Sequence, residues 1–166
     1  MVSRNWRYTP DHNPKAFFET ALTQGYRIIS LSYITEPAVA QICTVGPILR
    51  NNPDCANLFR KKRTYGDPNI WLLPDQPQDA IVYRLKMLLQ DLAHMDLDGH
   101  WEQYLKDDQI NWEKIAVSGQ SQGGGMAEYL VKYENLARVI SFSGRSDYSS
   151  PREIAKWYFI SQRTPV

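Results

Sequence analysis

One serine in this 166-residue chain has neighbours suited to nucleophilic chemistry, in the run Gly119-Gln120-Ser121-Gln122-Gly123. A serine hydroxyl attacks well only when a base accepts its proton and the backbone presents it to the substrate. A tight turn between a strand and a helix achieves that presentation, and it favours glycine two residues before and after the serine. We therefore predict that Ser121 is a nucleophile on such a turn, with Gly119 and Gly123 permitting the bend.

The residues on either side of this motif have the patterns that the turn requires. Residues 114–118 predict a short buried strand, and residues 126–133 have helical composition. The start of that helix would aim the backbone N–H of Gln122 at the oxyanion of a tetrahedral intermediate. The alternative is a glycine-rich phosphate-binding turn, but the spacings G-x-x-x-x-G-K-[ST] and G-x-G-x-x-G are absent.

The rest of the chain predicts strands that alternate with helices, and its length suits one domain spanning 1–166. Alternation of this kind is typical of the α/β class, in which a mostly parallel sheet carries helices on both faces. The expected helices cover 14–24, 78–95 and 101–105, and the expected strands cover 26–32, 114–118, 138–143 and 157–160.

Residues 36–77 are the least regular part of the chain and contain repeated prolines. Long irregular stretches in compact domains are often lids or binding loops, so this region is the candidate substrate-covering loop. A short helix is expected over 57–62. The basic run Arg60-Lys61-Lys62-Arg63 is predicted to be a solvated helix face rather than a polyanion-binding patch, because the overall charge is balanced.

Cys43 and Cys55 are the two cysteines of the chain, and a turn-rich stretch separates them. From the residues alone, a local disulfide and two free thiols are equally well supported. A metal site is not expected, because neither a CxxC motif nor a neighbouring histidine cluster accompanies the cysteines.

Charge and hydropathy exclude several classes of partner. The 19 Lys and Arg residues nearly balance the 18 Asp and Glu residues, which leaves no strong field to attract nucleic acid or an anionic membrane. No run approaches the ~20 apolar residues of a membrane span. Residues 1–8 lack the apolar stretch of a signal peptide. We expect neither a nucleic-acid partner nor a membrane span.

The order of these landmarks resembles that of a group of bacterial serine hydrolases in the α/β-hydrolase superfamily. The resemblance covers residues 14 to 160, and its sharpest motif is 119–125, where Gln120 replaces the histidine usual in the group. The other matching features are residues 25–33, the Cys43 and Cys55 pair, Arg84-Leu85, 101–105, 112–115, 139–143 and Asp147.

This resemblance implies a partial α/β-hydrolase core and a serine esterase-type reaction. An acyl-enzyme would form on Ser121 from an ester or another small-molecule substrate, and water would hydrolyse it without a metal or organic cofactor. Members of the group tend to be exported, which favours a disulfide between Cys43 and Cys55 and an exported parent protein.

The general base that this chemistry requires is not evident. In α/β-hydrolases the acid and then the histidine follow the serine along the chain, whereas His12, His94 and His100 all precede Ser121. We do not expect His94 or His100 to substitute, because both fall near the far end of a helix that should pack on the sheet. Asp147 is the candidate acid, with a loop or cap role as the favoured alternative.

Two interpretations of the incomplete machinery follow. The early strands and the oxyanion loop are not recognisable near residues 1–14, so we favour a fragment of a complete hydrolase that is nearly inactive by itself. The alternative is a short protein that has lost the chemistry and serves as a non-catalytic binding or interaction module. Open sheet edges would then invite pairing with a second copy of the chain.

Overall fold

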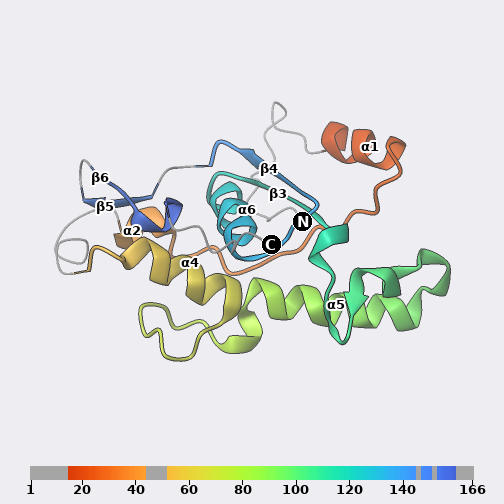
Figure 1. Ribbon diagram of the computed structural model, residues 1–166, viewed down its shortest axis with the longest axis horizontal. Coiled ribbons are helices and arrows are strands. Elements are labelled where there is room, and N and C mark those ends of the chain that lie inside the picture. The colour runs from red at the N-terminus through yellow and green to blue at the C-terminus, as the bar shows by residue number, and fades with distance from the viewer. Residues whose placement is uncertain (1–14, 44–51, 145–146, 151–152, 160–166) are drawn as a thin grey trace.

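The computed structural model describes residues 15–43, 52–144, 147–150 and 153–159 (Figure 1). The α-helices are α1 (Lys15–Thr23), α2 (Val39–Cys43), α4 (Cys55–Tyr65), α5 (Ile81–Met95) and α6 (Gln122–Tyr133). The strands are β1 (Leu105–Lys106), β2 (Gln109–Ile110), β3 (Ala116–Gln120), β4 (Arg138–Phe142), β5 (Tyr148–Ser150) and β6 (Glu153–Ile154). Short 3-10 helices are η1 (Pro77–Asp79), η2 (Leu97–Gly99), η3 (Trp101–Tyr104), η4 (Trp112–Lys114) and η5 (Lys156–Tyr158).

A strand–helix–strand unit, β3–α6–β4, forms the centre of the described structure. β3 and β4 pair in parallel, with Ala116 opposite Arg138 and Gln120 opposite Phe142. A crossover helix is the usual connection between parallel neighbours, and α6 packs against both strands (Figure 1). The strands expected over 114–118 and 138–143 and the helix expected over 126–133 are thus confirmed, with shifted ends.

The remaining sheets within the described residues are small. β1 pairs with β2 and β5 pairs with β6, in both cases antiparallel. The described part therefore contains one parallel pair with α6 on one face, while α1 contacts the sheet through Phe17, whose ring lies 5.6 Å from that of Phe142.

Two of the expected strands are wrong. Residues 26–32 are extended, and Leu31 and Tyr33 are buried on either side of exposed Ser32, but the described structure does not assign them to a strand. The alternating burial of a strand is therefore not sufficient to identify one here. Residues 157–159 fall in and after η5 instead of a strand, because Trp157 is fully buried and its ring packs 5.1 Å from that of Tyr129. Residue 160 lies outside the described residues.

The helices expected over 14–24 and 78–95 correspond to α1 and α5, and the helical segment expected over 101–105 is η3. α5 begins later than predicted because Pro77–Asp79 forms a separate 3-10 turn, in which the Asp79 carboxylate accepts a hydrogen bond from the Gln76 N–H at 2.8 Å. Asp79 therefore caps this preceding turn, and the Asp75 carboxylate accepts a hydrogen bond from Arg63.

The region 36–77 is more regular than its prolines suggested, because it holds α2 and α4. Cys43, the last residue of α2, and Cys55, the first residue of α4, form a disulfide with Cα atoms 5.6 Å apart. This bond joins the two helices across residues 44–51, which lie outside the described part of the chain. The short helix expected over 57–62 is confirmed and extends from Cys55 to Tyr65.

The prediction of a solvated basic face on α4 is wrong. Arg60, Lys62 and Arg63 are buried, and Lys61 is exposed. The two arginines are buried because each meets a buried carboxylate, Asp147 for Arg60 and Asp75 for Arg63. The Lys62 ammonium donates to the carbonyl oxygen of Asp67 at 3.0 Å.

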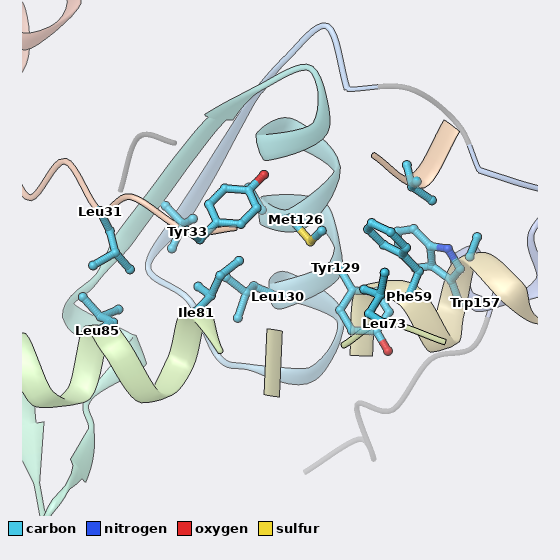
Figure 2. Close-up of a cluster of buried hydrophobic side chains, with 14 of the residues drawn as sticks. Leu31, Tyr33, Phe59, Leu73, Ile81, Leu85, Met126, Tyr129, Leu130 and Trp157 are labelled. Atoms are coloured by element: carbon cyan, nitrogen blue, oxygen red, sulfur yellow. The ribbon is translucent and has the colours of Figure 1, made fainter. Parts of the chain in front are cut away.

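The main core lies along α6. Met126, Tyr129 and Leu130 project from this helix toward α4, α5 and η5, and Figure 2 shows the Phe59, Tyr129 and Trp157 side chains gathered together. Ile81 of α5 is also fully buried in this cluster. α6 is therefore held between the parallel strands and the α4–α5 layer. Among the described residues, no helix is long and apolar enough to cross a bilayer.

Candidate functional site

Ser121 occupies the turn between β3 and α6 in a backbone conformation that non-glycine residues seldom adopt. Its φ is 52° and its ψ is −118°, and its side chain is exposed. The Ser121 N–H donates to the carbonyl oxygen of Phe142 at 2.8 Å, which extends the parallel ladder by one bond. Backbone strain of this kind costs about 1–3 kcal/mol and is concentrated at functional sites.

Gly119 is required by the tightness of this turn. A Cβ atom added at Gly119 would lie 2.2 Å from the carbonyl oxygen of Gly123 and 2.3 Å from its carbonyl carbon. Because both contacts are to backbone, no side-chain rearrangement relieves them. The backbone at Gly119 therefore has no room for a Cβ atom. Gly123 is buried at the start of α6.

A second glycine contact brings β4 close to α6. A Cβ atom added at Gly124 would lie 2.7 Å from the hydroxyl oxygen of Ser141. The same hydroxyl donates to the Glu128 carboxylate at 2.6 Å, so the helix and the strand are also tied by a hydrogen bond. The glycines after Ser121 thus allow the helix to start directly against the sheet.

Gln122 is the first residue of α6, so its backbone N–H has no partner within the helix. An N–H group at this helix position, next to an exposed hydroxyl, is suited to stabilise an oxyanion that forms on a substrate attacked by Ser121. The Gln122 side chain is also engaged. Its Nε2 donates to the carbonyl oxygen of Thr35 and its Oε1 accepts from the N–H of Val39, both at 2.9 Å.

Histidine is not close to the hydroxyl in the described structure. His94 lies in the last turn of α5 with its Nδ1 2.7 Å from the carbonyl oxygen of Gln90, and His100 is exposed beyond η2. α5 packs on η3, η3 packs on η4, and η4 leads into the N-terminal end of β3, whereas Ser121 follows the C-terminal end of β3. Within the described part of the chain, the Ser121 hydroxyl has no hydrogen-bond partner. His12 lies outside it.

Asp147 is buried, and its carboxylate is bound by Arg60 and Trp157. Arg60 donates through Nη2 at 2.8 Å and through Nε, and the Trp157 indole N–H donates at 3.0 Å. Burial by itself would lower the pKa of Arg60, but the hydrogen bond and charge of Asp147 raise it, so the guanidinium stays protonated. The structure thus gives Asp147 a hydrogen-bonding arrangement that joins the C-terminal segment to α4.

Sequence reasoning missed Arg60, Arg63 and the Gln122 side chain as organising residues. Arg63 donates to the carbonyl oxygens of Glu36 and Pro37 at 2.9 and 3.1 Å, in addition to its bond with Asp75. One feature of the sequence could have indicated the role of the arginines. Arg60 and Arg63 are three residues apart on a predicted helix, and Phe59 is four residues before Arg63, so the helix places the two arginines on one face beside an apolar ring.

Three tyrosines near the core have raised pKa values. Burial raises the pKa of Tyr158 to about 12, and the nearby charge of Asp147 adds to the effect. Burial also raises the pKa of Tyr65 and of Tyr129. The Tyr65 hydroxyl donates to Glu134 and the Tyr129 hydroxyl donates to Asn57, both at 2.9 Å. All three side chains are held in their neutral forms at ordinary pH.

The described side chains include no group of three or more His, Cys, Asp or Glu residues placed to hold a metal ion. No protein-family model, curated protein or solved structure matches this chain.

Proposed function

We propose that the chain carries the nucleophile of a serine esterase-type hydrolase, with Ser121 as the attacking residue. The observation that supports this most strongly is the conformation of Ser121, which is strained and exposed between a parallel strand and a helix. Such strained conformations are concentrated at functional sites. The close contact between Gly119 and Gly123 indicates the same constraint.

In the proposed reaction, the Ser121 Oγ attacks the carbonyl carbon of an ester and its proton passes to a base. The tetrahedral oxyanion accepts a hydrogen bond from the Gln122 N–H, and the C–O bond to the alcohol then breaks. The alcohol leaves with a proton, and water later hydrolyses the acyl group from Ser121. The partial α/β-hydrolase core with helices on both faces of a mostly parallel sheet is part of the same proposal.

The reaction is expected to be slow in this chain, because no described side chain hydrogen-bonds the Ser121 hydroxyl. Loss of the base removes most of the acceleration of a serine hydrolase, although positioning and oxyanion stabilisation remain. An acyl group transferred from an activated ester should therefore accumulate on Ser121 more readily than it is released.

Acyl-group trapping tests this proposal. The chain is incubated with p-nitrophenyl acetate, digested and mapped by mass spectrometry, beside Ser121→Ala and Ser143→Ala. Ser143 is a matched control, because it is exposed, has a φ of 50° and follows the neighbouring strand β4. Acetylation of Ser121 that persists in Ser143→Ala supports the proposal, and acetylation confined to lysines contradicts it.

A non-catalytic interaction module is the second candidate. It is favoured by the β4 side chains Ile140 and Phe142, which are 40% and 45% exposed. A second copy of the chain is the partner that an open sheet would pair with most directly. Sedimentation equilibrium of the chain and of Phe142→Glu tests this: a dimer that the substitution dissociates supports pairing with a second copy, and a monomer in both cases contradicts it.

A further inference from the structure

The Gln122 side chain forms an amide clamp on a segment distant in sequence. It donates to the carbonyl oxygen of Thr35 and accepts from the N–H of Val39, so one side chain satisfies both ends of residues 35–39. The partners are 87 and 83 residues away along the chain. Gln122 directly follows Ser121 in the chain. Its side chain therefore links residues 35–39 directly to the residue next to the proposed nucleophile.

α4 also holds this segment. Arg63 donates to the carbonyl oxygens of Glu36 and Pro37, and its Nε is bound to Asp75. Three consecutive carbonyl groups, those of residues 35, 36 and 37, are thus fixed by side chains from two helices. These hydrogen bonds satisfy backbone carbonyl groups that lie outside regular secondary structure, and they fix the segment in place.

The segment continues into α2, which is anchored at both ends. The Val39 N–H at its start is bound by Gln122, and Cys43 at its end is joined to α4 by the disulfide. Residues 35–43 are therefore fixed relative to α6 and α4, although they form no strand. An enzyme orients its substrate through groups that are held rigidly near the reacting atom.

We propose that the Gln122 side chain is a positioning residue that fixes the segment Thr35–Val39 as the second wall of the Ser121 site. This inference rests on the proposed function, since a wall has a catalytic meaning only if Ser121 reacts. Gln122 would then contribute twice, through its backbone N–H at the oxyanion and through its side chain at the facing segment.

The test measures the second-order rate constant for labelling by a biotin-tagged ethyl fluorophosphonate, with imidazole added as an external base. The variants are Gln122→Met, which removes both side-chain hydrogen bonds and keeps the backbone N–H, and Gln109→Met as the matched control at an exposed glutamine. We expect Gln122→Met to lower the rate constant about 10- to 100-fold, the range for a misplaced reacting group. Gln109→Met should leave it unchanged.

A conservative variant supplies a readout that general destabilisation would not produce. In Gln122→Glu, a protonated carboxyl can donate to the Thr35 carbonyl oxygen and accept from the Val39 N–H, whereas an ionised carboxylate cannot donate. The labelling rate relative to the unmodified chain, measured without imidazole because imidazole is protonated in this range, should therefore fall as pH rises through the ordinary Glu pKa of about 4.3.

The outcomes separate the two proposals. The positioning role is overturned if Gln122→Met changes the labelling rate constant less than twofold. It is also overturned if the rate of Gln122→Glu relative to the unmodified chain does not vary with pH. In both cases Ser121 remains the nucleophile. Labelling no faster than that of Ser121→Ala overturns the proposed function, and the positioning role falls with it.

Discussion

The guanidinium of Arg60 and the carboxylate of Asp147 form a buried ion pair that joins α4 to the segment after β4. The side chains are 1% and 3% exposed, and Nη2 of Arg60 lies 2.8 Å from Oδ1 of Asp147. Trp157 donates to the same carboxylate. With three donors on its oxygens, Asp147 is arranged to hold the C-terminal segment in place, and we expect its main effect on Ser121 to be through stability.

Asp147→Asn should therefore destabilise the chain strongly. Removing one partner of a buried ion pair leaves an uncompensated charge, which costs about 3–5 kcal/mol in the free energy of unfolding. Urea denaturation measures the change. Asp108→Asn is the control, because Asp108 pairs with Lys86 at 2.8 Å on the surface, where such pairs contribute at most about 1 kcal/mol. A folded Asp147→Asn variant with unchanged stability but no reaction at Ser121 would instead indicate a catalytic carboxylate.

Gly119→Ala should disrupt the turn that presents Ser121. Its new methyl group would meet the backbone of Gly123 at 2.2–2.3 Å, so we expect a loss of about 3 kcal/mol or more in the free energy of unfolding. Gly25→Ala is the matched control. Gly25 has a φ of 80° with no atom within 4 Å of an added Cβ, so only backbone strain of about 1–2 kcal/mol applies. Equal losses at the two positions would argue against a special constraint at Gly119.

The sequence predicted the elements around Ser121 well because their signals are local. An apolar run, a glycine-rich turn and a helical composition follow one another between residues 114 and 133, and β3 and α6 form there. The extended residues 26–32 were harder, since their alternating burial is that of a strand, although the described structure does not assign them to one. The fate of Arg60 and Arg63 depended on Asp147 and Asp75, and no local pattern reveals such partners.

Reduction of the disulfide should destabilise the chain by about 3 kcal/mol, the loop-closure value for cysteines of this separation. Cys43 and Cys55 are 12 residues apart, and both are fully buried. Urea denaturation with and without a reductant measures the change, and Cys43→Ser/Cys55→Ser provides a form that cannot respond to the reductant. If α2 anchors residues 35–39, the reduced chain should also exchange its Val39 amide hydrogen faster. An unchanged unfolding midpoint on reduction would contradict the prediction.

Stability should decline at alkaline pH because of the buried tyrosines. The pKa of Tyr158 is raised to about 12 in the folded chain, against about 10 in the unfolded chain. Between these values the unfolded state has lost the proton and the folded state has kept it, so the stabilising contribution is complete below pH ~10 and is lost as pH rises toward ~12.

Urea denaturation at several alkaline pH values measures the decline. Tyr158→Phe should make the loss of stability at alkaline pH smaller. Tyr26→Phe, at an exposed position, should leave that loss unchanged. A Tyr158→Phe chain with an unaltered alkaline decline would contradict this assignment.

The central claim is that Ser121 is a nucleophile presented by a strained turn, and labelling by a fluorophosphonate tests it most directly. The unmodified chain, Ser121→Ala and Ser143→Ala are treated with the same probe, and the modified residue is located by peptide mass spectrometry. We predict one adduct on Ser121, formed slowly without an added base and faster with imidazole, lost in Ser121→Ala and retained in Ser143→Ala. An unmodified chain that labels no more than Ser121→Ala, with imidazole present, would contradict the claim.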